Sequence, residues 1–264
     1  MISEMKQEAL QSLKGKWGLG VGSTILYYIL GYIASMVTTF IFAIPGIIIF
    51  SGVALLTGAF EEETMSIGTG ITFGILYFIM IILSITSYGI TSYGYTNLFL
   101  QISKGEDAKI DHLFEGFRGF KRMIKTMWAM LATILYTGTW IPLVLLGLFG
   151  FFNNEGNGTM NPSLVIAFVV LLIISTVVVI VTYFSYAMIY YVMVENPNYS
   201  VSQAMKQSKA IMKGHKLDLF LLWLSFIGWA ILAIIPLGLG FLWLCPYINT
   251  TTAHFYRHIS KDEL

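Results

Sequence analysis

Residues 200–258 read SVSQAMKQSKAIMKGHKLDLFLLWLSFIGWAILAIIPLGLGFLWLCPYINTTTAHFYRH, and this stretch decides the fold. It begins with a polar, lysine-rich segment and continues into two apolar runs, which are separated by a Pro-Gly break at residues 236–240. A cationic amphipathic helix can lie on a membrane surface, and apolar helices of this kind can cross the bilayer. The stretch therefore predicts an interfacial helix followed by a helical hairpin, and we expect the chain to contain three such units.

The composition places the whole chain in the membrane class. Hydrophobic residues make up 56% of it and charged residues 11%, against the roughly one quarter that is usual for soluble domains, and its mean hydropathy is +0.76. A net charge of +1 gives no indication of a nucleic-acid partner. The single Cys245 excludes an internal disulfide, and no Cys/His spacing matches a metal or cofactor site. The histidines are expected at water-facing ends: His112, His215, His254 and His258.

The apolar runs predict an all-α, polytopic transmembrane bundle of six spans, which forms three hairpins in one domain over residues 1–264. The spans are expected at 19–42, 71–100, 127–151, 164–194, 217–235 and 239–255. Residues 17–60 hold no charge and would form roughly 66 Å of helix, about twice the hydrocarbon thickness. We therefore expect a break at Pro45-Gly46 and a re-entrant or interfacial piece at 47–60.

Each hairpin is preceded by a segment with the pattern of a basic amphipathic helix. In residues 1–16 and 104–125, apolar side chains recur at helical spacing: Ile2, Met5, Ala9 and Leu13 in the first, and Leu113, Phe117, Phe120 and Ile124 in the second. The third begins at Ser200 and Gln203, which fit a capping box, and its expected apolar side is Val201, Ala204, Met205, Ser208 and Ile211. The candidate interfacial lipid contacts are the cations of the last two segments: Arg118, Lys121, Arg122, Lys125, Lys206, Lys209, Lys213 and Lys216.

The cations also predict the orientation. With six spans, all 15 Lys and Arg fall on one side, which the positive-inside rule makes cytoplasmic, together with both termini. If residues 47–60 crossed the membrane, the lysines at 6, 14 and 16 would face away from the others, so six spans are favoured over seven. The acids expected outside are Glu61, Glu62, Glu63 and Glu155.

Two short motifs are treated as coincidences. The C-terminal residues 261–264 spell the KDEL signal for retrieval to the endoplasmic reticulum, but retrieval needs a luminal tail and the predicted tail is cytosolic. Residues 157–159 form a glycosylation acceptor pattern on the side expected to be outside; such tripeptides are common by chance, and the pattern has no meaning if the source is bacterial.

Three stretches carry a resemblance to a known family: residues 13–18, 208–229 and 238–256. Together they resemble the bacterial membrane family called domain of unknown function 975, and the likeness covers essentially the whole chain. The resemblance implies a polytopic protein of Gram-positive-type plasma membranes, with no established activity. The chain departs from the family pattern by its extra apolar piece and glutamate-rich loop around residues 43–66.

The predicted spans, away from their ends, contain no Asp, Glu, Lys or Arg. Ion-coupled transporters and pumps usually keep such residues at depth, so this absence disfavours an ion-driven carrier. It also leaves no carboxylate pair, metal cluster or Ser/His/Asp group for catalysis, and we expect a protein that is not an enzyme.

Uncharged polar side chains form a candidate seam on three of the spans. The seam consists of Ser84, Tyr88, Thr91, Tyr95, Tyr183, Tyr186, Tyr190, Asn249 and Thr251. One interpretation is helix packing, because such residues allow close approach and hydrogen-bond to neighbouring helices. The sharper hypothesis is that the three stripes meet at a cytoplasmic-leaflet cavity for a lipid headgroup or small amphiphile, with Lys213, Lys216 or Arg122 near its mouth.

The leading functional hypothesis is a non-enzymatic, multi-pass plasma-membrane protein. It would serve as an accessory, envelope-response or immunity-type factor through contacts with a protein or with anionic lipid headgroups on the cytoplasmic side. The alternative is a transporter or lipid-handling protein that uses the uncharged cavity. A water-accessible cavity lined by the seam would favour the alternative, and a tightly packed seam would favour the leading hypothesis.

Overall fold

The computed structural model describes residues 2–56, 67–138, 141–142, 144–146, 149 and 162–261. These residues form ten α-helices and one 3-10 helix, η1, which confirms the expected all-α class. In chain order the elements are α1 (Ile2–Leu13), α2 (Trp17–Leu56), α3 (Ile67–Lys104), η1 (Ile110–Phe117), α4 (Phe120–Thr137), α6 (Pro162–Tyr186), α7 (Ile189–Glu195), α8 (Val201–Ile211), α9 (Lys216–Leu224), α10 (Ile227–Ile234) and α11 (Phe241–Ile259). The glutamate-rich loop at 61–63, Glu155, the acceptor pattern at 157–159 and the tail at 262–264 lie outside the described residues.

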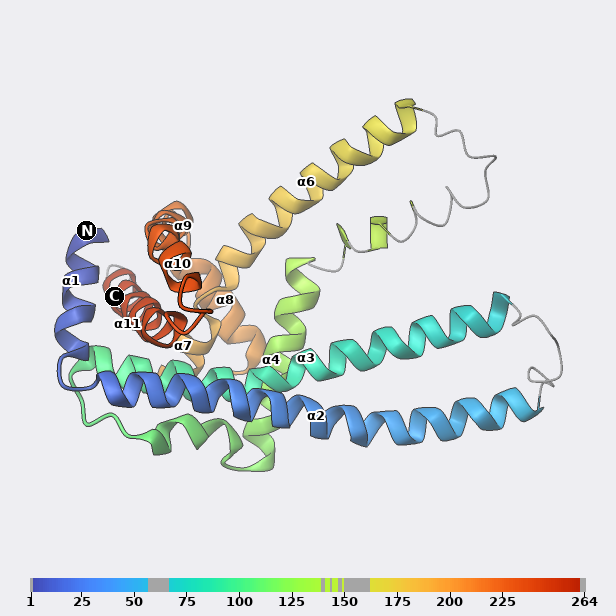
Figure 1. Ribbon diagram of the computed structural model, residues 1–264, viewed down its shortest axis with the longest axis horizontal. Helices are drawn as coiled ribbons and strands as arrows, with labels where there is room; N and C mark the ends of the chain where they lie inside the picture. Colours follow the sequence, from blue (N-terminus) through green and yellow to red (C-terminus); the bar gives the residue numbers. More distant parts are fainter. Residues whose placement is uncertain are drawn as a thin grey trace.

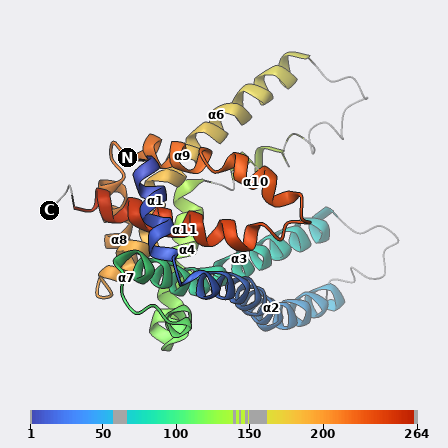
Figure 2. The same ribbon diagram turned by 60° about the vertical axis from the view of Figure 1, so that its left-hand side comes forward.

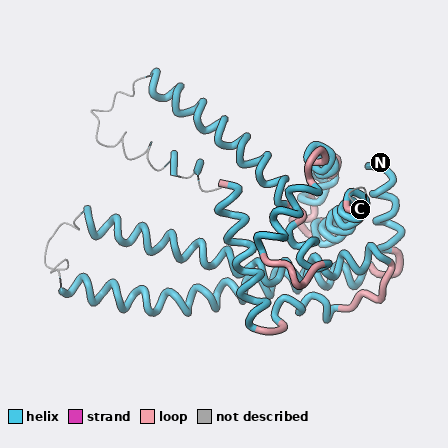
Figure 3. Tube along the Cα trace, turned by 180° about the vertical axis from the view of Figure 1, so that it is seen from behind, coloured by secondary structure: helices cyan, strands magenta, loops and turns pink. Residues whose placement is uncertain are grey.

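The molecule consists of a packed base from which long helices extend (Figure 1). We call the base the assembly of α1, η1, α7, α8 and α11 with the first turns of α2 and α4 and the last turns of α3. Two arms leave it, one made of α2 and α3 and the other of α4 and α6, and they diverge from each other. Both chain ends lie at the base. The loops from α3 to η1 and from α7 to α8 lie there too (Figure 3).

Helix α11 is the central element of the base. More than half of its 19 residues are buried, and it contacts α1, α2, α3, α9 and α10. Figure 2 shows it passing behind α1 and beside α3. Three threonines, at 250–252, and His254 are among its buried residues. The second half of the helix is thus enclosed by protein, whereas Trp243 in its first half is 52% exposed, so the predicted sixth span at 239–255 is only partly enclosed.

The arms are apolar and face outward. On α6 the side chains of Ile166, Ile173 and Val178 are each more than half exposed, which is a stable arrangement in lipid and a costly one in water. Four segments are long and apolar enough to cross a membrane: Trp17–Ile48, Tyr77–Lys104, Val165–Glu195 and Lys216–Ile234. Helix length and composition therefore indicate a membrane protein.

The expected break at Pro45-Gly46 is wrong. Helix α2 runs without interruption through Pro45 to Leu56, so residues 47–56 continue the same helix, of which Trp17–Ile48 is the candidate span; residues 57–60 lie outside the described part. A proline removes one backbone hydrogen bond but need not end a helix in a membrane, where a backbone outside a helix would lose many more. The second span, predicted at 71–100, is likewise longer and coincides with α3.

Three other predicted spans differ from the structure in detail. The span at 164–194 is divided into α6 and α7 by a turn at Ala187, and the span at 217–235 into α9 and α10 by a turn at Ser225. The helix that contains the start of the span predicted at 127–151 begins earlier, at Phe120, and α4 ends at Thr137, before Gly138, whose φ of 68° is left-handed. Most of residues 139–151 lie outside the described part.

The three basic segments had mixed outcomes. In α8 the capping box of Ser200 and Gln203 and the five buried residues are as predicted, but the helix ends at Ile211 and packs against α7, α6 and α4, whereas an interfacial helix was expected. In α1 the expected face is buried at Met5, Ala9 and Leu13, but it packs against α11.

The middle segment is not one amphipathic helix. Gly119, with a φ of 94°, separates η1 from α4. Leu113 is buried, but Phe120 and Ile124 are exposed, so the apolar stripe predicted across both elements does not exist as a single face. The apolar residues recur at helical spacing on both sides of Gly119, but the backbone at Gly119 is not helical.

Candidate functional site

The seam residues on α3 hold α3 against α2. The hydroxyl of Tyr95 lies 2.8 Å from Thr24 Oγ1, and Ser84 Oγ lies 2.5 Å from Thr39 Oγ1. The ring of Tyr88 lies against Gly31, where an added Cβ would come within 2.6 Å of it. Thr91 donates within its own helix, to the carbonyl of Tyr88, at 3.1 Å.

Of the other seam residues, Tyr190 reaches the α3 stripe, because its hydroxyl would lie 2.9 Å from a Cβ added at Gly89. Tyr190 donates to the Thr126 carbonyl at 3.4 Å, and Tyr183 and Tyr186 contact the rings of Trp223 and Tyr136. Asn249 and Thr251 donate within α11, to the Cys245 and Tyr247 carbonyls. The three cavities described below are lined by other residues, and the contacts of the seam residues given above are of the kind that packs helices together.

The candidate cations separate into two sets. Arg118, Lys121, Arg122 and Lys125 line one cavity of about 450 Å³ at the start of α4. We call it the basic cavity, and its remaining walls are Tyr93, Gly119, Phe120, Thr126, Met193 and Pro197. The second set lies apart from it, with Lys206, Lys209 and Lys213 exposed on or just after α8 and Lys216 half-buried at the start of α9.

Part of the positive charge in the basic cavity is balanced by acids of η1. Arg118 pairs with Asp111, which raises the pKa of the Arg118 guanidinium, and it also lies 3.7 Å from Glu115. Arg122 Nη1 lies 3.6 Å from the same Glu115 carboxylate, and its guanidinium lies 5.8 Å from the centre of the Tyr93 ring. These contacts fix both guanidinium groups at the wall of the cavity.

Lys125 lies in a different environment from the two arginines. Its ammonium donates to the Pro197 carbonyl at 2.8 Å. Partial burial, and then the positive charge of Arg122, lower the pKa of Lys125 below that of an ordinary lysine. The protonated side chain would therefore be stabilised by an anion in the cavity.

A larger polar cavity of about 1130 Å³ adjoins the basic cavity and shares Tyr93, Arg122 and Pro197 with it. Its wall contains Glu195, which pairs with Lys104 at 2.8 Å and accepts a hydrogen bond from the Tyr256 hydroxyl at 2.8 Å. This network was not predicted from the sequence, where Glu195 is simply the first residue after the predicted span at 164–194. The one available signal was an acid in a mainly cationic stretch.

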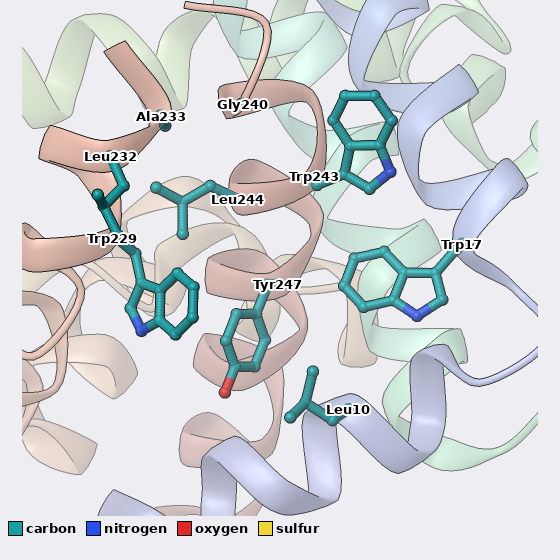
Figure 4. Close-up of a pocket in the computed structure, with 9 residues that line it drawn as sticks. All are labelled: Leu10, Trp17, Trp229, Leu232, Ala233, Gly240, Trp243, Leu244 and Tyr247. Atoms are coloured by element: carbon teal, nitrogen blue, oxygen red, sulfur yellow. The ribbon is translucent and has the colours of Figure 1, made fainter. Parts of the chain in front are cut away.

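An apolar pocket of about 410 Å³ lies between α1, α2, α10 and α11. Figure 4 shows Trp17 and Trp243 on one side of it and Trp229 on the other, with Tyr247 between them. Sequence reasoning missed this pocket too, since its indoles are far apart in the chain. It holds no charged group, so it could receive only an apolar ligand.

The histidines do not form a metal site. Among the residues that the structure describes, no three or more His, Cys, Asp and Glu side chains are grouped so that they could hold an ion. His254, expected at an interface, is only 9% exposed, and it lies 2.9 Å from Ser12 and 3.2 Å from Glu8 of α1. It joins α1 to α11.

A search of curated proteins and a search of solved structures each found no match. The family described as protein of unknown function (DUF975) matches residues 1–263, which is nearly the whole chain. The resemblance seen in the sequence is thereby confirmed, and the chain belongs to the DUF975 family.

Proposed function

We propose that this protein is a six-span plasma-membrane protein of three hairpins, with both termini in the cytoplasm. It catalyses no reaction and acts as an accessory, envelope-response or immunity-type factor, through contacts of its base with anionic lipid. The partner is the headgroup layer of the cytoplasmic leaflet.

The observation that carries this proposal is the separation of charge from apolar surface. All 15 Lys and Arg belong to the base or to the start of the third hairpin. The described parts of α2 and α6 hold no charged residue, and α3 holds only its last residue, Lys104. By the positive-inside rule, the cationic end of the base, which carries both termini, would lie on the cytoplasmic side, while α11 crosses the membrane.

The exposed lysines of α8 support lipid as the partner. Lys206 and Lys209 point away from the buried face of a capped helix. Each cation near an anionic surface contributes about 1 kcal/mol, so a base with many of them is held firmly against such a membrane.

The transporter alternative receives less support. It needs the uncharged seam to line a path, whereas Tyr95 and Ser84 bond to α2 and Asn249 bonds within its own helix. A protein that works by surface contacts has no need of such a path.

Cysteine accessibility in intact cells tests the orientation. In a Cys245→Ser background, a cysteine is placed at Glu62, Lys109 or Lys209, and a membrane-impermeant maleimide is added. We expect labelling of the variant at 62 in intact cells, and labelling at 109 and 209 only after permeabilisation. Labelling at Lys209 from outside would overturn the proposed function.

A further inference from the structure

We propose that the basic cavity holds the phosphate headgroup of an anionic phospholipid from the cytoplasmic leaflet. This inference rests on the proposed function for its orientation and goes further by naming a defined site. The site is the space enclosed by Arg118, Lys121, Arg122 and Lys125, and its volume of about 450 Å³ lies within the range of small-ligand sites.

The chemistry of the wall calls for an anion. Four cations surround the cavity, and the acids paired with them are Asp111 and Glu115, both of which bind the arginines. In the described part of the chain, neither Lys121 nor Lys125 has a carboxylate partner within ion-pair distance. A phosphate group would supply the missing negative charge and accept several hydrogen bonds at once.

The arginines are positioned before any ligand arrives. Arg122 is held between Glu115 and the face of Tyr93, and it also donates to the Glu115 carbonyl at 3.2 Å. A guanidinium fixed in this way loses little side-chain entropy on binding, so it favours a localised contact over a diffuse attraction.

The outer face of α4 favours a lipid over free phosphate. Phe120, Ile124 and Trp128 are 76%, 50% and 54% exposed, and their i, i+4, i+8 spacing places them in one stripe beside the cavity. Acyl chains can lie along this stripe while the headgroup enters the cavity. Exposed apolar side chains at the rim of the cavity would make no favourable contact with a soluble anion.

The test compares two double variants of the full chain, purified in detergent and titrated with phosphatidylglycerol or phosphatidylcholine by native mass spectrometry. Lys121→Gln with Lys125→Gln removes two cavity cations, and Lys14→Gln with Lys109→Gln removes two exposed cations that do not line the cavity. We expect the cavity variant to lose roughly tenfold or more in phosphatidylglycerol affinity, while the control variant keeps the wild-type affinity for this single bound lipid. Monodisperse elution and unchanged thermal unfolding confirm that both variants are folded.

Two further arms identify the source of the phosphate. Inorganic phosphate is added as competitor, and Ile124→Ser alters only the apolar stripe. We expect phosphate to compete poorly and Ile124→Ser to weaken phosphatidylglycerol binding. If phosphate alone binds as tightly as the lipid and depends on Lys121 and Lys125, the site is for a soluble anion and the lipid inference is overturned.

The remaining outcomes separate this inference from the proposed function. Equal losses in the cavity variant and the Lys14/Lys109 control variant would mean a diffuse surface attraction, which overturns the defined site and leaves the proposed function standing. If the wild-type protein shows no preference for phosphatidylglycerol over phosphatidylcholine, both fail.

Discussion

Gly94 on α3 faces the backbone of η1 at a distance that leaves no room for a side chain. A Cβ at this position would lie 1.9 Å from the carbonyl oxygen of Leu113, and the neighbouring atoms are also backbone. Gly94→Ala should therefore destabilise the protein by roughly 1–3 kcal/mol or more, as overpacking does, and thermal unfolding in detergent would measure the loss. Gly22→Ala on α2 is the matched control, because nothing lies within 4 Å of its added Cβ.

The outcome of that control has its own expected sign. Alanine in an open helical position is favoured over glycine by about 0.5–1 kcal/mol, so Gly22→Ala should be neutral or stabilising. If Gly94→Ala behaved in the same way, the close contact between η1 and α3 would be disproved.

Lys125 gives a prediction that depends on pH. Because burial and Arg122 lower its pKa, Lys125 loses its proton at a lower pH than an ordinary lysine, and the basic cavity then loses one positive charge. Phosphatidylglycerol affinity should fall as the pH rises through this lowered pKa. In Lys125→Arg, which stays charged, the fall should be absent over the same range.

Phosphatidylglycerol titrations at a series of pH values, by native mass spectrometry or by fluorescence, would measure this change in affinity. A wild-type affinity that is flat across the alkaline range would show that the charge of Lys125 does not contribute to lipid binding. The free energy of unfolding of the lipid-free protein should rise over the same pH range, because deprotonation removes the cost of a partly buried ammonium next to Arg122.

At the scale of single elements, the capping box and the buried face of α8 were predicted, and the segment between α3 and α4 was not. The capping box and apolar face of α8 are local features, decided by residues three or four positions apart. The middle segment has the same spacing, but Gly119 divides it at a left-handed backbone angle, and η1 is shaped by its contact with α3. Spacing alone cannot reveal a contact between distant segments.

The same reasoning explains what was missed at the candidate site. The four cations of the basic cavity were identified, because basic residues in an amphipathic pattern indicate an interface. Their enclosure by Tyr93 and Met193 could not be predicted, since those residues come from α3 and α7. The central place of α11 was missed for a related reason: threonines and Asn249 fit a polar stripe in lipid as well as a protein interior.

The capping box of α8 can be tested directly. Ser200→Ala removes the hydroxyl that accepts a hydrogen bond from the backbone N–H of Gln203 at 3.3 Å. Loss of an N-cap typically costs about 1 kcal/mol of stability. We expect a lower unfolding temperature for this variant. Ser202→Ala, at the exposed second residue of the same helix, should leave the temperature unchanged, and an equal effect in both variants would exclude a specific capping role.

At the scale of the whole molecule, the third hairpin decides the number of spans. Lys216–Ile234 contains 19 residues, which rise about 28 Å and just match a hydrocarbon core of about 30 Å. One contact works against a full crossing, because Lys6 of α1 donates to the Ser225 carbonyl at 3.0 Å, between α9 and α10. The six-span arrangement requires the long stem of Lys6 to carry its charge toward the interface.

A cysteine at Leu237, the most exposed residue of the turn between α10 and α11 at 97%, measures this directly. In the Cys245→Ser background we expect an impermeant maleimide to label it in intact cells, because six spans place the turn outside, opposite the base. Labelling only after permeabilisation would make the third hairpin re-entrant from the cytoplasmic side and leave four spans. Both termini would remain cytoplasmic in that case, because either arrangement crosses the membrane an even number of times and keeps every cation on the same side.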